Sequence, residues 1–193
     1  MKTMLMISLL FATNAFAAKF AIDPAHSEVG FSVKHMMISK VKGKFKKFEG
    51  SFDFDSKNGE LKDIDVKIDA TTIDTNNAKR DEHLTSPDFF DVKKYPQITF
   101  KSDKVESKDG KPVKAMGTLA MNGKSNKVTL DIDYGGVQPD GQGGEKVGFS
   151  AATKINRKDY NVNWNKSLDK GGVAVSDEVV IEINGEAGST KSK

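Results

Sequence analysis

Five polar side chains of the sequence could do chemistry: His26, Arg80, Asp81, His83 and Arg157. Arginine binds phosphate or pyrophosphate through pairs of parallel hydrogen bonds, so Arg80 and Arg157 are candidates for holding an anionic head group. A histidine beside a carboxylate could instead transfer protons, which makes His26 or His83 with Asp81 the candidate acid–base pair of an enzyme. Each of these residues has a structural role as its alternative, such as an ion pair between Arg80 and Asp81.

The spacing of these residues does not match a known catalytic or metal motif. The three histidines, His26, His35 and His83, form no HxH or HExxH motif and the chain contains no cysteine, so we expect no metal site. No G-x-S-x-G motif surrounds a serine, and Asp81 and His83 are two positions apart, which on a helix turns them to different faces. We therefore expect no catalysis and no cofactor.

One segment interrupts a chain that elsewhere alternates apolar and polar residues. Residues 76–86 contain few β-branched residues, follow a possible N-cap at Thr75 and precede Pro87, which together predict a short helix. The adjacent rings of Phe89 and Phe90 do not fit an alternating strand, so at least one of them should plug or cover something. We expect the insert formed by residues 76–95 to line or cover one end of a cavity.

Alternation with a period of two residues predicts about eight long strands, each with an apolar and a charged face, as in residues 29–33. Short turns such as the Asn-Gly pair at 122–123 join neighbouring strands. The apolar positions change from odd to even numbers near residues 46–47, which predicts a β-bulge there. We expect an all-β fold, a single antiparallel, roughly eight-stranded, lipocalin-like barrel of up-and-down topology, with a two-sheet sandwich as the alternative.

A barrel of eight strands is either filled by side chains or able to hold one small ligand. Gly43, Ala70, Ala115, Gly117 and Ala151 are small at inward positions where a packed core needs bulk. Small residues can also face large ones, so these positions leave both interpretations open. Almost no inward position is titratable, so a hollow barrel would suit an aliphatic chain and not a sugar, peptide or nucleotide.

The two ends of the chain indicate an exported protein with one domain. Residues 1–17 combine Lys2, a short apolar run and a small-x-small site at 15–17, as in a secretory signal peptide. Residues 18–186 then form the barrel domain, and the small, polar residues 187–193 a disordered tail. Without cysteine, an exported chain needs an ordinary core or a closed sheet, which suits a bacterial periplasm.

Charge is mixed along the sequence except at residues 40–47, KVKGKFKK, which contain five lysines. This segment is either the solvated face of a strand or a surface that meets an acidic partner. Nucleic acid is not an expected partner, because its binding needs more basic charge with exposed aromatic residues nearby.

Several short motifs resemble, in order and spacing, those of the YceI-like family: DPAHS (23–27), FSVKHMMIS (31–39), the GKF and FEG pairs (43–50), RDEHLTSPDFFDVKKYPQITF (80–100) and INRKDY (155–160). The resemblance runs from about residue 20 to residue 186. It implies a secreted, lipocalin-like barrel associated with polyisoprenoids and other long-chain lipids, so residues 18–186 would be a lipid-binding domain.

We therefore expect a periplasmic protein that binds, sequesters or transports a long-chain isoprenoid or fatty lipid. The expected cavity wall is formed by Phe31, Phe45, Phe89, Phe90, Phe100 and Phe149, and the expected polar contacts are His26, Arg80, His83 and Arg157. No membrane span is expected, since the apolar run near the N-terminus is shorter than the ~20 residues a helix needs. A homodimer stays open, as do two rival functions: an isomerase- or dehydratase-like enzyme, and an interaction module with a solid barrel.

Overall fold

The computed structural model describes residues 17–169 and 171–190. The predicted signal peptide, residues 1–17, lies outside the described residues except for Ala17, and so do the last three residues of the predicted tail. Among the residues that the structure describes, no helix is both long enough and apolar enough to cross a membrane.

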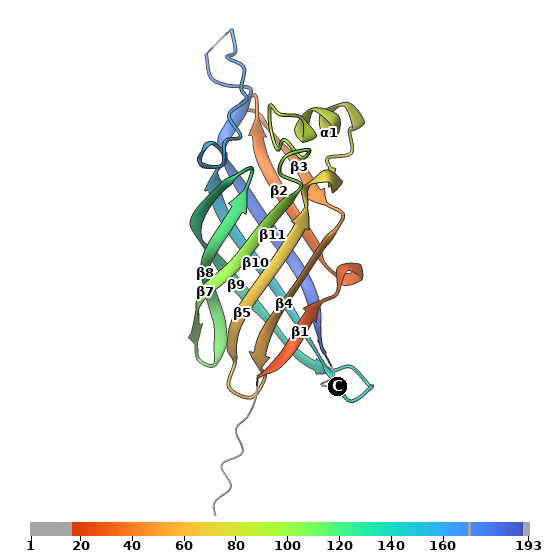
Figure 1. Cartoon of the computed structure of the whole chain (residues 1–193). Helices are drawn as coiled ribbons and strands as arrows, with labels where there is room; N and C mark the ends of the chain where they lie inside the picture. Colours follow the sequence, from red (N-terminus) through yellow and green to blue (C-terminus); the bar gives the residue numbers. More distant parts are fainter. Residues whose placement is uncertain (1–16, 170, 191–193) are drawn as a thin grey trace, which may run out of the picture.

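Eight antiparallel strands form a closed barrel (Figure 1). In order around the barrel they are β1 (Ala18–Ile22), β4 (Phe48–Asp55), β5 (Glu60–Asp69), β7 (Gln97–Lys108), β8 (Lys111–Met121), β9 (Lys124–Pro139), β10 (Glu145–Asn156) and β11 (Val175–Ser189). Pairing of β1 with β11 closes the sheet, with Phe20 opposite Ser189. The predicted barrel is confirmed, and the sandwich is excluded.

Two further strands lengthen one side of the barrel: β2 (Glu28–His35) and β3 (Ser39–Phe45). β1 pairs with the last residues of β11, and after the short 3-10 turn η1 (Pro24–His26) β2 pairs with the preceding residues of the same edge of β11. β3 then pairs with β2. A two-residue strand, β6 (Ile73–Asp74), pairs with the end of β3. The barrel wall is therefore taller on the side of β2 and β3 than elsewhere.

Residues 46–47 separate β3 from β4, so the predicted β-bulge is a break between two strands instead. The amide of Lys46 donates to the carbonyl of Thr72 and the amide of Lys47 to its hydroxyl, at 3.2 and 3.0 Å. Thr72 ends the 3-10 turn η2 (Ala70–Thr72), and its two acceptors replace the ladder bonds of a continuous strand. The predicted change from odd to even inward positions is confirmed, because the odd-numbered Phe45 is buried before the break and the even-numbered Phe52 after it.

The segment after β6 contains the helix α1 (Ala78–Thr85), inside the predicted range of 76–86. Asn77, and not Thr75, is its N-cap, accepting a hydrogen bond from the amide of Arg80 at 3.0 Å. We call residues 75–96 the insert. The excursion, residues 161–174, follows the 3-10 turn η3 (Arg157–Tyr160) and precedes β11. Figure 1 places α1 and the excursion at one end of the barrel, here called the helix end, and the last residues of β11 near the other, the terminal end.

The prediction of a disordered tail is wrong for residues 187–189, because β11 continues to Ser189. β11 pairs there with β1 on one side and with β10 on the other. Ala187 is fully buried and belongs to the same apolar cluster as Phe20. The small side chains of this segment, which in the sequence suggested a flexible tail, fit into the place where β11 pairs with β1 and closes the barrel.

Candidate ligand-binding site

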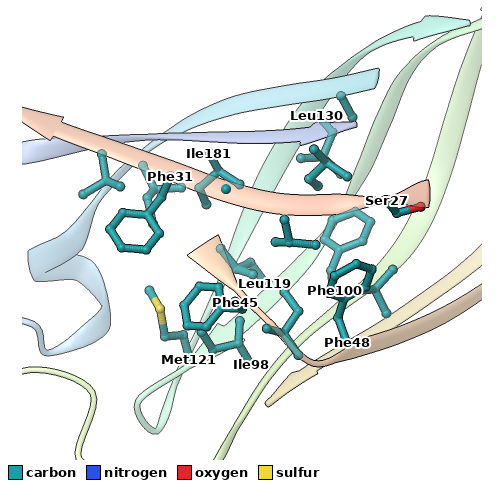
Figure 2. Close-up of a pocket in the computed structure, with 18 of the residues that line it drawn as sticks. Ser27, Phe31, Phe45, Phe48, Ile98, Phe100, Leu119, Met121, Leu130 and Ile181 are labelled. Atoms are coloured by element: carbon teal, nitrogen blue, oxygen red, sulfur yellow. The ribbon is translucent and has the colours of Figure 1, made fainter. Parts of the chain in front are cut away.

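A cavity of about 370 Å³ lies inside the barrel. This volume falls within the roughly 300–1,000 Å³ of ligand pockets. Figure 2 shows its apolar wall, with the labelled side chains Phe31, Phe45, Phe48, Ile98, Phe100, Leu119, Met121, Leu130 and Ile181. The structure places all six of the expected wall phenylalanines on the cavity: Phe31, Phe45, Phe89, Phe90, Phe100 and Phe149. The barrel is therefore hollow rather than filled by its own side chains.

Two of the small inward residues make room for rings and not for a ligand. A Cβ atom at Gly43 would collide with the ring of Phe31, and one at Gly117 would collide with the backbone carbonyl of Lys101 and lie 2.7 Å from the ring of Phe100. The space that these glycines leave is thus already occupied. Ala115 and Ala151, by contrast, lie on the cavity wall themselves.

The terminal end of the barrel is closed by aromatic packing. Phe20 is fully buried and stacks on Phe52 with the ring centroids 5.7 Å apart, and Phe54 packs edge-on against Phe20 at 5.9 Å. Tyr134 packs beside Phe54 at 5.7 Å. Because Phe52, Phe54 and Tyr134 also line the cavity, they form its floor. A ligand must therefore enter from the helix end.

Three segments frame the cavity at the helix end: the β2–β3 hairpin, the insert and the excursion. Their lining residues there are His35 and Val41, Arg80 and His83, and Val162 and Trp164, respectively. Since these residues come from parts of the chain that are far apart in sequence, only the closed barrel brings them together. We call the region that they frame the mouth.

His83 joins the insert to the excursion. Its ring packs edge-on against Phe89 and Trp164, with centroids 5.0 and 5.2 Å away. Its Nε2 lies 2.9 Å from Oδ2 of Asp88, whereas Asp81 bonds elsewhere. The acid–base pair of His83 and Asp81 that an enzyme could use is therefore not assembled.

Arg80 faces the cavity with part of its guanidinium not used by the protein. Its Nε donates to Oγ1 of Thr75 and its Nη2 to the carbonyl of Thr75, both at 2.7 Å. Asp81 accepts from the amide and hydroxyl of the same threonine, at 2.9 and 2.6 Å. Within residues 17–169 and 171–190, Nη1 of Arg80 has no hydrogen-bond partner and no carboxylate pairs with the guanidinium. The alternative of an Arg80–Asp81 ion pair is wrong, and an unneutralised positive charge lies at the mouth.

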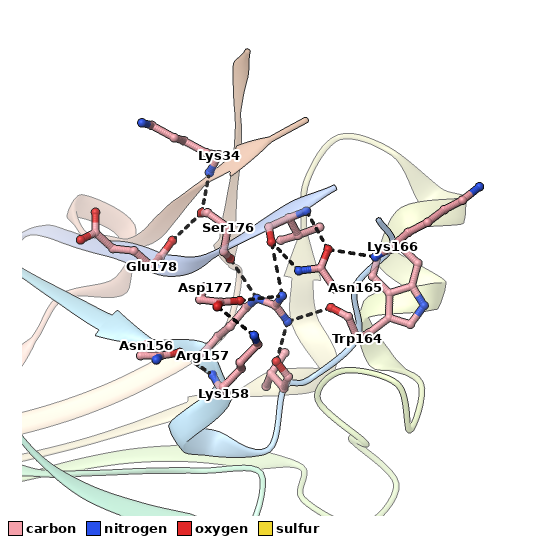
Figure 3. A network of polar contacts seen from close by, with 12 residues as sticks. Lys34, Asn156, Arg157, Lys158, Trp164, Asn165, Lys166, Ser176, Asp177 and Glu178 are labelled. Carbon is pink, nitrogen blue, oxygen red and sulfur yellow. Dashed lines mark hydrogen bonds and ion pairs between the residues drawn. The ribbon is translucent and has the colours of Figure 1, made fainter. Parts of the chain in front are cut away.

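Arg157 lines the cavity but uses its donors on the protein (Figure 3). Its side chain is only 4% exposed, Nη1 donates to the carbonyls of Val162 and Trp164, and Nε donates to the carbonyl of Ser176. Burial lowers the pKa of Arg157, and the carboxylate of Asp177, 3.4 Å from Nη2, opposes that shift. The guanidinium therefore fastens the excursion to the start of β11, which competes with the predicted contact to a head group.

His26 lies outside the cavity, with its side chain 59% exposed and Nδ1 2.8 Å from Oδ2 of Asp23. This hydrogen bond, with one from the amide of Ala25, lowers the pKa of Asp23. Glu186 completes a group of possible metal ligands whose ligand atoms lie within 4.8 Å of one another. Nζ of Lys146 is 3.9 Å from Oδ2 of Asp23 and 3.5 Å from Oε2 of Glu186. The ammonium group of this lysine therefore already provides a positive charge beside the two carboxylates. The position of His26 does not support the predicted ligand contact.

A family model described as "YceI-like domain" matches residues 20–187. The chain belongs to the YceI-like family. This YceI-like chain is 40% identical over 181 residues to a UPF0312 protein of Enterobacter sp. (strain 638), covering 92% of each chain. The solved YceI protein of Campylobacter jejuni is 39% identical, with a TM-score of 0.72 over 82% of this chain and 90% of that one. A polyisoprenoid binding domain from Saccharophagus degradans has a TM-score of 0.66 at 12% identity, covering 90% and 99%, which shows the shared fold alone.

Sequence reasoning missed several cavity residues of this YceI-like chain, among them Val162 and Trp164. Both lie in the excursion, where no alternation marks an inward face. The available signal was that Trp164 is the single tryptophan of the sequence, placed within a polar segment. A large apolar side chain in such a segment needs a surface to cover, and here that surface is the mouth.

Proposed function

We propose that this YceI-like protein binds one long-chain hydrophobic ligand, a polyisoprenoid or a similar amphiphilic lipid, and sequesters or transports it in the periplasm. The observation that carries the proposal is the hollow barrel, with an apolar wall, an aromatic floor and the cation of Arg80 at the mouth. A ligand with an aliphatic tail and an anionic head group matches all three features. The enzyme alternative called for an acid–base pair of His83 and Asp81, and these two residues bond to Asp88 and Thr75 instead.

The tail would supply most of the affinity. Moving one methylene group out of water contributes about 0.8 kcal/mol, so about ten of them contribute ~8 kcal/mol before the cost of ordering the ligand. A sugar, peptide or nucleotide would leave its polar groups without partners against this wall. Tail length should therefore affect affinity more than any single protein contact.

The comparisons support the same class of ligand. The Saccharophagus degradans domain, which shares the fold, is named for binding polyisoprenoids. The periplasmic location rests on the signal-peptide features of residues 1–17. A homodimer stays a prediction of the sequence, and native mass spectrometry would report it together with any bound lipid.

Mass spectrometry of lipids extracted from the protein, purified from its own periplasm, tests the proposal directly. We expect one hydrophobic species at close to one molecule per chain. A lipid-free protein that also fails to take up a polyisoprenol or a fatty acid added in detergent would contradict the proposal and favour the alternative of a protein-interaction module.

The charge at the mouth predicts a preference for an anionic head group. Arg80→Met should weaken binding of a polyisoprenyl phosphate about 10- to 100-fold, because a hydrogen bond to a charged group contributes ~1.5–3 kcal/mol. Binding of the corresponding neutral alcohol should stay nearly unchanged, since its tail contacts the same wall. Competition against a fluorescent lipid measures both affinities.

Lys79→Met is the matched control for Arg80→Met, because Lys79 is the preceding residue of α1 and is exposed. It should leave both affinities unchanged. Equal losses for the phosphate and the alcohol in Arg80→Met would mean that Arg80 acts only by holding Thr75, and the head-group role would be discarded.

A further inference from the structure

The turn between β2 and β3 carries the three large hydrophobic side chains that are exposed in the described part of the chain. Met36 is 44% exposed, Met37 54% and Ile38 85%. Single exposed apolar residues are ordinary on a protein surface, whereas three in succession form a contiguous apolar patch, a feature that calls for an explanation. We call these three residues the apolar tip.

The backbone of the apolar tip is also in an unfavourable conformation for its residues. Met36 and Met37 have φ angles of 51° and 63°. This left-handed region suits Asn and Gly at the two central positions of a hairpin turn and is uncommon for bulky side chains. Asn and Gly would fit this turn with less backbone strain than the two methionines do. Such departures from local conformational preference are concentrated at functional sites.

Lysines without acidic partners surround the apolar tip. Lys34, Lys40 and Lys42 are exposed, and none of them pairs with a carboxylate within the described residues. Lys34 lies directly opposite Lys40 across the β2–β3 ladder, where like charges destabilise a sheet. The sequence has no Asp or Glu between Glu28 and Glu49, so this surface has no negative charge of its own strands to neutralise it.

The apolar tip adjoins the mouth of the cavity. His35, the last residue of β2, lines the cavity and immediately precedes Met36. The amide of Met36 donates to the carbonyl of Ala174 in the excursion at 2.8 Å. In Figure 1 the β2–β3 hairpin and the excursion reach the same end of the barrel.

We propose that the apolar tip and its lysines dock the protein on an anionic phospholipid bilayer. The three apolar side chains enter the interface, Lys34, Lys40 and Lys42 contact lipid phosphates, and the mouth then faces the membrane surface. An acidic protein would satisfy the lysines but not an exposed isoleucine at the very end of a hairpin, so the bilayer is the occupant that fits both features. Delivery of a lipid through the mouth rests on the proposed function, but docking itself does not.

Removal of the apolar groups can be designed so that the turn improves. The triple variant Met36→Asn, Met37→Gly and Ile38→Thr puts the preferred residues at the two left-handed positions. We expect its unfolding temperature to equal or exceed that of the parent protein. Its affinity for vesicles of phosphatidylcholine with phosphatidylglycerol, measured by flotation, should fall at least about 10-fold, because the inserted apolar area is lost.

The charge requirement has its own variant and control. Lys34→Gln with Lys40→Gln and Lys42→Gln should weaken binding to the same vesicles on the order of 100-fold, at about fivefold for each lysine. The matched control changes Lys57, Lys108 and Lys111 to Gln. Lys57 lies in the β4–β5 turn, and Lys108 and Lys111 are the strand ends on either side of the β7–β8 turn. The two turns meet at the terminal end, where Gly59 approaches Gly110. The control should bind vesicles as the parent does.

Four outcomes decide the matter. Selective flotation with anionic vesicles, lost in both test variants and kept in the control, supports docking. Equal flotation with neutral vesicles, or an equal loss in the control, overturns the role assigned to the lysines. No vesicle binding together with binding to polyglutamate assigns the surface to an acidic protein and overturns the proposal. Lipid content of the purified variants, measured in parallel, reports the cavity separately, so failure to dock is distinguishable from failure to bind lipid.

Discussion

Ala151→Trp is expected to weaken binding of a long-chain lipid by about two orders of magnitude. Ala151 lines the cavity in the middle of β10, paired with Ile132 on one side and Ile183 on the other. An indole at this position would block the passage between the mouth and the aromatic floor. A tail that loses about four methylene contacts loses ~3 kcal/mol, so the affinity should fall by about two orders of magnitude.

Ala152→Trp is the matched control, because the next residue of a strand points to the other face and Ala152 is exposed. Both variants add the same side chain to the same strand. The amount of co-purified lipid per chain, determined by mass spectrometry, should be near zero for Ala151→Trp and unchanged for Ala152→Trp. Equal lipid content in two variants that unfold at similar temperatures would contradict a ligand inside the barrel.

Alternation predicted the cavity wall well because a strand offers only two faces. Once the inward face of each strand is known, Phe31, Phe45, Phe100 and Phe149 must point into the barrel, and they do. Whether the barrel is filled was not predictable from the same pattern. Gly43, for example, reads as empty space in the sequence but faces the ring of Phe31 in the structure.

The polar residues were harder to predict because their partners are backbone atoms or lie far away in the sequence. Arg80 and Asp81 are neighbours with opposite charges, yet both bond to Thr75 and not to each other. Arg157 is held by backbone carbonyls, which every residue type has, so no sequence motif could predict these partners. The burial of Ala187 was equally hard to predict, because its pairing with β1 closes the barrel and depends on the complete fold.

Arg157→Met is expected to lower the free energy of unfolding by roughly 3–5 kcal/mol. It removes the donors that satisfy the carbonyls of Val162, Trp164 and Ser176, and each buried acceptor without a partner costs about 1–3 kcal/mol. For a domain of this size, the melting temperature should fall by roughly 10 °C. Arg157→Lys should recover little of this loss, because a single ammonium group cannot reproduce the planar fork of donors.

The control for Arg157→Met is Lys158→Met, which removes the neighbouring charge that also pairs with Asp177, at 2.8 Å, but is 46% exposed. Its cost should be at most about 1 kcal/mol. The excursion that Arg157 fastens carries Trp164, so loosening it should also shift the emission of this single tryptophan to longer wavelength. If Arg157→Met instead kept its melting temperature and tryptophan emission but lost lipid, the guanidinium would have to be reassigned from holding the mouth together to holding the ligand.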